Sequence, residues 1–283
     1  FFPSKRYSAF LLYIDGMVDS KIVNDFVLKP LMLRNEANTF EANIAKVAIS
    51  SNITVRRKKS FDLADYILNN LIPQNSVTKV QEFQKIISDV NSGNCALFVD
   101  TLNNAFSIEV KGFKARSVSN PNNEIVVRGS QEAFVEVIRT NTSMLRRIVN
   151  NEDLIIENSK VGSISNTQIA ICYMKSIAND SLVAEVKYRI NNLDVDYLIS
   201  SGQLEQLIQD DYAVVFPEII ATERPDKAAD HLLEGRVVVI VNGSPYALIM
   251  PGVLVDFISS PEDLNLKFQY SNLLRVIRYI AAF

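Results

Sequence analysis

The sequence has few of the side chains that build metal and redox sites. Its 283 residues include one histidine, two cysteines and no tryptophan. Because His231 is alone, two-histidine ligand patterns are excluded, and Cys95 and Cys172 lie too far apart to form a Cys-x-x-Cys pair. Both cysteines lie in apolar runs, which favours buried, reduced thiols. The sequence therefore predicts no metal site and no disulfide framework.

Glycine-rich phosphate loops and long apolar runs are also missing. Neither G-x-G-x-x-G nor G-x-x-x-x-G-K-[ST] occurs among the nine glycines, so no cofactor is predicted. No run approaches the roughly 18 to 20 apolar residues that cross a bilayer. A net charge of -3 supplies no general positive field for a phosphate backbone, so nucleic acid is not an expected partner.

What is present is typical of a folded protein with helices and strands. Hydrophobic residues make up 48% of the chain and charged residues 22%, and 283 residues suffice for two domains. The alternating segments open with a buried strand at 7–19, a helix capped by Ser20 and a strand at 53–60. We predict an α/β (mixed α+β) fold of two lobes, each a mixed sheet with packed helices. Residues 118–123, rich in Ser, Asn and Pro, are predicted to link lobes 1–117 and 124–283.

A weak structural repeat is expected to close each lobe. A predicted helix at 79–91 is followed by Gly93, a strand, a turn and a second strand. The same order recurs at 225–250, with Gly235 in the place of Gly93. Each glycine stands where the end of a helix favours a left-handed residue. The run RVVVIV after Gly235 is apolar on both faces, which indicates a covered inner strand.

The second lobe is expected to open with a long helix behind Gly129 and Ser130. An apolar stripe runs from Phe134 to Ile148 at helical spacing. The start of such a helix could bind an anion through its free N–H groups, and a simple turn with an N-cap is the alternative explanation.

Structural roles explain most of the conspicuous residues in the segment ATERPDKAADHLLEGRVVVIVNGSPYALIMP, residues 221–251. Thr222 can cap the helix, Pro225 fits the first turn, and His231 is expected on the solvated or half-covered side rather than in catalysis. No catalytic residue is predicted. Glu223 and Arg224 are left over as contact residues.

A ligand-binding role is the more specific hypothesis for these two residues. Together with Arg128 they are predicted to face a crevice between the lobes, where an arginine would hold a carboxylate and Glu223 an ammonium group. In the alternative, Arg128 stacks over the linker and the other two residues serve the start of the helix.

A basic cluster, VRRKK, lies in the first lobe. Arg56, Arg57, Lys58 and Lys59 are most simply an exposed strand end. The alternative is contact with anionic lipid headgroups, each basic residue contributing roughly 1 kcal/mol.

Several segments together resemble the A subunits of nutrient germinant receptors, the GerA family of endospore-forming bacteria. The resemblance spans nearly the whole chain and is carried most specifically by TERPDKAADHLLEGR and VVRGSQEAFVEVIRTNTSMLRRI, with FLLYIDGMVD, VLKPLM, YRINNLDVDYLISSGQLEQLI and SNLLRVIRY in agreement.

The resemblance implies a hydrophilic N-terminal domain on the cytoplasmic side of the inner spore membrane, followed by transmembrane helices. Arg275 and Arg278 would then flank the first span. It also implies B and C subunits and other A subunits as partners, a small-molecule germinant, and no catalysis by this domain. An enzyme that acts on a small polar metabolite between the lobes stays open as the alternative.

Overall fold

The computed structural model describes residues 7–33, 63–68, 72, 76–112, 124, 130–209, 217–258 and 268–282. The chain divides into two compact units, Phe1–Lys114 and Ala115–Phe283. The α/β class is confirmed, since each unit combines a sheet with packed helices, and every described strand pair is antiparallel. The predicted linker, 118–123, lies outside the described residues.

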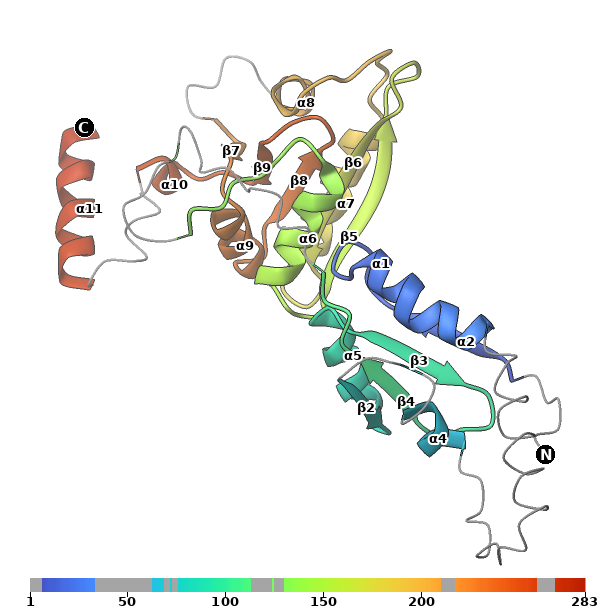
Figure 1. Ribbon diagram of the computed structural model, residues 1–283. Helices are drawn as coiled ribbons and strands as arrows, with labels where there is room; N and C mark the ends of the chain where they lie inside the picture. Colours follow the sequence, from blue (N-terminus) through green and yellow to red (C-terminus); the bar gives the residue numbers. More distant parts are fainter. Residues whose placement is uncertain are drawn as a thin grey trace, which may run out of the picture. The chain divides into compact units, whose positions relative to one another are not determined.

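The first unit holds a four-stranded sheet in the order β1-β3-β4-β2. Helices α1, η1, α2 and α4 cover one face, and α5 packs on the other, as Figure 1 shows. The η1 segment is a π-helical stretch that continues α1 into α2. The elements are β1 (Ala9–Leu12), α1 (Ser20–Ile22), η1 (Val23–Leu28), α2 (Lys29–Leu33), α4 (Leu63–Tyr66), β2 (Val77–Val80), α5 (Phe83–Asn91), β3 (Cys95–Val99) and β4 (Ala105–Ile108).

The second unit holds a five-stranded sheet in the order β5-β6-β8-β9-β7. Residues of α6 and α9 build the core on one face, and those of α7 and α8 build it on the other. The elements are α6 (Ile138–Ile148), β5 (Leu154–Val161), β6 (Thr167–Met174), α7 (Asp180–Asn191), α8 (Ser201–Ile208), β7 (Ile220–Thr222), α9 (Pro225–Leu233), β8 (Val237–Val241), β9 (Ala247–Met250), α10 (Leu254–Ile258) and α11 (Phe268–Ala282).

The predicted repeat is present and is larger than expected. The order β1-β3-β4-β2 in the first unit has the same pairing as β6-β8-β9-β7 in the second. From β2 to β4, residue n corresponds to residue n + 142: Val80 pairs with Ala105, and Thr222 pairs with Ala247. The hairpin turns also match, because Thr101 and Gly243 both have a positive φ.

The first strands of the two repeats, β1 and β6, also correspond, but at a different constant difference in residue number. Phe10 pairs with Phe98, and Ala170 pairs with Ile240, so residue n of β1 corresponds to residue n + 160 of β6. Asp19, which caps α1, then corresponds to Asn179, which caps α7. Helix α6 and strand β5 precede the second repeat and have no described counterpart before the first.

Three expectations for the first unit are wrong. The strand at 7–19 is not buried: β1 is an edge strand, and only Leu11 turns toward the core beneath the helices. The N-cap of the following helix is Asp19 rather than Ser20, because its carboxylate accepts hydrogen bonds from the Lys21 and Ile22 amides. In addition, Val80 belongs to β2, so α5 starts at Phe83 rather than at Lys79.

The long helix predicted behind Gly129 and Ser130 is shorter than expected. Helix α6 begins only at Ile138, so Ser130 does not start a helix and the anion-binding hypothesis loses its basis. The physical reason is Asn141, which is fully buried and whose amide pairs with both the N–H and the C=O of Val135. These bonds hold the preceding chain outside the helix.

Gly235 confirms the expected left-handed helix end and generates a stability prediction. Its φ is +90°, and an added Cβ would lie 3.0 Å from the carbonyl oxygen of Ile177. Gly235→Val should therefore destabilise the fold by about 2 kcal/mol or more, measured by chemical denaturation. The matched control is Gly202→Ala in α8, where no atom lies within 4 Å of an added Cβ and the change should be neutral or slightly stabilising. Equal unfolding midpoints for the two variants would contradict this assignment.

Candidate functional site

Two charged side chains are buried where β7 runs into α9. Arg224 is fully buried and Glu223 is 6% exposed. Burying a charge is costly unless it is paired and hydrogen-bonded. The next residue, Pro225, starts α9 and has no N–H, so the helix start loses no hydrogen bond there. This junction is the candidate functional site because two of the three predicted ligand-binding residues lie in it.

The guanidinium of Arg224 is held by groups of the same unit. Its Nε and Nη2 donate to the two carboxylate oxygens of Asp226, at 3.1 and 2.6 Å. Its Nη1 donates to the carbonyl oxygen of Glu124, at 3.2 Å. A two-point contact with a carboxylate is the strongest geometry available to arginine, and here the protein supplies that carboxylate itself.

Glu124 connects the site to a distant part of the sequence. Its Oε2 accepts from the Thr222 hydroxyl at 2.5 Å and from the Glu223 amide at 3.0 Å. Its Oε1 lies 3.2 Å from the Lys227 ammonium. Thr222 is therefore no direct helix cap; its hydroxyl oxygen accepts from the Arg224 amide, one residue before the helix. No sequence motif marked Glu124, since it follows the Ser/Asn/Pro-rich segment as an ordinary loop acid.

Glu223 joins the site to the segment in front of α6. Its Oε1 accepts a hydrogen bond from the Tyr246 hydroxyl at 3.0 Å. Its carbonyl oxygen accepts from the Phe134 amide at 2.7 Å. Glu223 thus connects strand β7 with the hairpin between β8 and β9 and with the segment around Phe134 that precedes α6.

A second polar cluster lies at the other end of α9. His231 is 7% exposed, so its expected place on the solvated or half-covered side is wrong. Its Nδ1 lies 3.0 Å from Glu234. Arg236 pairs with both Glu234 and Asp256. Burial alone would raise the pKa of Asp256, but hydrogen bonds from Arg236 and the Val253 amide outweigh it and hold that pKa below its usual value.

The remaining predicted residues lie outside the part of the chain that the structure describes. Arg128 is one of them, and the basic cluster Arg56, Arg57, Lys58 and Lys59 is the other. The structure brings Glu223 and Arg224 together with Glu124, Asp226 and Tyr246. Their ligand-binding role stays a prediction, and it would require the Arg224 guanidinium to exchange a protein partner for a ligand.

The guanidinium of Arg224 and the carboxylate of Glu223 each have a partner within the second unit. Among the described residues, no three His, Cys, Asp or Glu side chains lie close enough together to hold a metal ion. Both thiols are buried and free, as expected, and burial raises the pKa of Cys95 and that of Cys172 to about 12. Neither thiol is an activated nucleophile at neutral pH.

Comparison with known proteins gives this fold a family. The sequence pattern of the family described as "Bacillus/Clostridium GerA spore germination protein" matches residues 2–283. The chain belongs to the GerA family. Among its relatives in Bacillus subtilis, Spore germination protein KA is 32% identical over 96% of this chain and 46% of its own length. Spore germination protein B1 is 34% identical over 98% of this chain and 53% of its own length.

A solved structure agrees with this assignment. The crystal structure of the N-terminal domain of the A subunit of the Bacillus megaterium spore germinant receptor GerK3 has a TM-score of 0.58 and 30% sequence identity. The likeness covers 88% of this chain and 84% of that one. This GerA-family chain spans about half the length of the curated relatives it matches.

The contacts of Arg224 predict a large effect of its removal. Arg224→Met should destabilise the second unit by about 2 to 4 kcal/mol, because Asp226 and the Glu124 carbonyl lose their buried partner. Lys29→Met is the matched control: Lys29 forms an exposed pair with Asp25 at 2.6 Å, which contributes less than about 1 kcal/mol. Urea unfolding measures both, and an Arg224 variant as stable as the Lys29 variant would refute the structural role.

Proposed function

We propose that this chain is the N-terminal domain of the A subunit of a nutrient germinant receptor, and that it relays the nutrient signal that triggers germination. The observation that carries the proposal is the likeness to the GerK3 A-subunit domain over 88% of the chain at 30% identity. Family membership over residues 2–283 supports the same role.

The proposal includes a place in the cell and a set of partners. The receptor works as an assembly of A subunits with B and C subunits, and this domain lies at the inner spore membrane on the cytoplasmic side. The relatives are about twice as long as the chain, which leaves room for membrane spans in the rest of the protein. Within the described residues, no helix is both long and apolar enough to cross a membrane. Helix α11, with Arg275 and Arg278, would lead toward the first span.

A non-enzymatic, signal-relaying role agrees with the site. The charges at the β7–α9 junction pair with one another and tie three segments together. Such a junction transmits a displacement from one segment to the next without any chemical step. A small-molecule germinant bound near Arg128, Glu223 and Arg224 would act on the same junction, and release of ions by the assembled receptor would follow.

The proposal is tested in spores of a Bacillus host. Deleting the gene for the full-length protein should abolish germination with at least one nutrient, measured by the fall in optical density. The intact gene and a gene with Gly202→Ala should restore that response, and the response to nutrients served by other receptors should not change. A deletion that leaves germination with every nutrient unaltered would contradict the proposal.

A conservative change separates direct binding from relay. Glu223→Gln keeps an oxygen that can accept from Tyr246 but removes the charge that would meet an ammonium group. If the junction binds the germinant, the nutrient concentration for half-maximal germination rate should rise about tenfold or more, the loss expected for a charged contact. If it only relays the signal, that concentration should stay the same while the maximal rate changes.

The basic cluster gives a separate prediction for membrane contact. If Arg56, Arg57, Lys58 and Lys59 meet anionic headgroups, changing all four to Ser should weaken sedimentation of the chain with phosphatidylserine vesicles by at least about tenfold. Added salt should weaken binding of the parent in the same way. Undiminished binding of the serine variant would exclude a membrane role for this cluster.

A further inference from the structure

The two repeats differ in what covers one face of the sheet. In the second unit, α6 packs against α9, β6 and β8. Ala170 and Cys172 of β6 are fully buried on this face, in one core cluster with residues of α6. In the first unit, no described helix stands in the place of α6. Phe10 and Leu12, which correspond to Ala170 and Cys172, are exposed, Phe10 by 62%.

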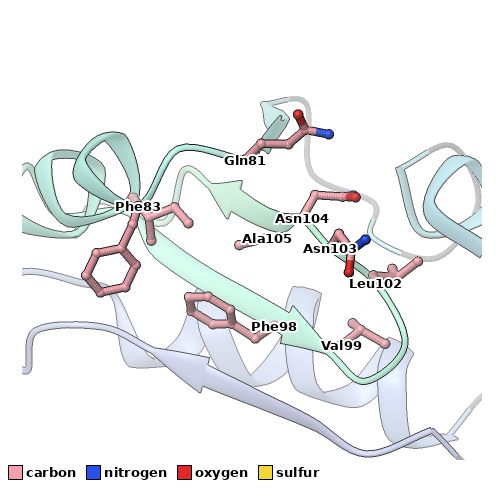
Figure 2. A pocket seen from close by; sticks show the side chains of 9 residues that line it. Gln81, Phe83, Phe98, Val99, Leu102, Asn103, Asn104 and Ala105 are labelled. Carbon is pink, nitrogen blue, oxygen red and sulfur yellow. The ribbon is translucent and has the colours of Figure 1, made fainter.

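A pocket lies on this uncovered face of the first unit. Its volume is about 290 Å³, and Figure 2 shows Phe83, Phe98 and Ala105 along it, with Asn104 and Leu102 toward one end. Phe83 is 65% exposed although it starts α5 beside the pocket. Phe98 is stacked on Phe10, with ring centroids 4.6 Å apart. The aromatic surface therefore extends from the pocket to the edge strand β1.

The second unit shows what fills the corresponding place. Phe134 is 3% exposed and shares a core cluster with Ala228, Ile240 and Ala247. By the n + 142 rule these three residues correspond to Ile86, Phe98 and Ala105, and all three of those line the pocket. The pocket thus corresponds to a part of the second unit's core cluster to which Phe134 belongs.

The backbone contacts of the Phe134 segment indicate how it is held. The Phe134 amide donates to the Glu223 carbonyl at 2.7 Å, the Gly243 amide donates to the Glu136 carbonyl at 2.7 Å, and the Ile138 amide donates to the Asn242 side chain at 3.2 Å. These bonds fix the non-helical stretch that leads directly into α6.

The first unit offers polar groups at the matching positions. Gln81, the counterpart of Glu223, lines the pocket, and Asp100 stands in the place of Asn242. Asn104 also lines the pocket, and its Nδ2 is buried without a hydrogen-bond partner. Its counterpart Tyr246 donates to Glu223. A buried donor without an acceptor is costly, and a backbone carbonyl placed in the pocket would satisfy it.

We propose that this face of the first unit binds a segment of another polypeptide, in which a non-helical stretch carries an aromatic anchor residue and continues into an amphipathic helix. The aromatic side chain enters the pocket between Phe83 and Phe98, a carbonyl next to it accepts from Asn104, and the helix covers Phe10 and Leu12. This is helix-in-groove recognition with one buried aromatic anchor. The inference does not depend on the proposed function, because it rests on the two units of this chain alone.

A peptide with the chemistry of the second unit's own segment tests the proposal. The probe is a fluorescein-labelled synthetic peptide of residues 130–150, titrated with the full chain and followed by fluorescence polarisation. We expect saturable binding that weakens about thirtyfold or more when the peptide carries Phe134→Ala, the loss typical of a buried aromatic anchor. Absence of saturable binding would overturn the proposal.

Protein variants locate the binding site. Phe83→Lys changes an exposed side chain and should keep the parent's melting temperature, whereas Phe10→Lys also removes the stack on Phe98 and should lower that temperature slightly. Both variants should lose peptide binding at least about tenfold. Phe26→Lys is the matched control, because Phe26 is also exposed but lies in η1 on the other side of the sheet. If Phe83→Lys and Phe10→Lys bind as tightly as Phe26→Lys, the peptide has exchanged with the segment in the second unit, and the proposal fails.

Discussion

The fold depends on one close backbone approach, which occurs once in each unit. At the end of α5 and of α9 the chain turns through a glycine with a φ near +90° and enters the central strand of the sheet. An added Cβ would lie 3.2 Å from the Met17 carbonyl oxygen at Gly93 and 3.0 Å from the Ile177 carbonyl oxygen at Gly235. Met17 and Ile177 are equivalent residues by the n + 160 correspondence of the first strands. The glycine thus sets the distance between the last helix of each repeat and the turn after its first strand.

The second unit adds a network of buried charge to this frame. Glu124, Thr222, Arg224 and Asp226 are joined by ion pairs and hydrogen bonds around the β7–α9 junction, so a displacement of any one of them breaks at least one of these contacts. In the first unit, Glu82 has the place of Arg224 and is exposed. The two units therefore share a topology, but only the second has a stiff polar junction at the start of its helix.

Local chemistry was readable from the sequence, and contacts between distant segments were not. The glycine helix ends and the inner strand after Gly235 were predicted because each depends on a few neighbouring residues. The start of α6 was misplaced because it depends on Asn141, which the spacing counted in an apolar stripe. His231 was misplaced because the helical pattern did not reveal the pairing of Arg236 with Asp256 beside it.

The candidate site was predicted only in part, for the same reason. Glu223 and Arg224 were predicted as contact residues because they were left over once the other conspicuous residues of 221–251 had been given structural roles. The structure added Glu124, which lies about a hundred positions away and has no local motif. Its hydrogen bonds with Glu223 and Arg224 offset part of the free-energy cost of burying these two residues. The extension of the repeat to the strands β1 and β6 could not be predicted from the sequence either, because the equivalent residues Phe10 and Ala170 have unlike side chains. Only strand pairing relates them.

The two buried thiols have a consequence for the lifetime of the protein. Burial raises the pKa of each cysteine to about 12, so the thiolate form is rare at neutral pH. Oxidants and alkylating agents attack the thiolate, and here it is both rare and enclosed. His231, the only imidazole in the chain, is enclosed as well. Oxidation or alkylation of this chain through its thiols should thus be slow at neutral pH.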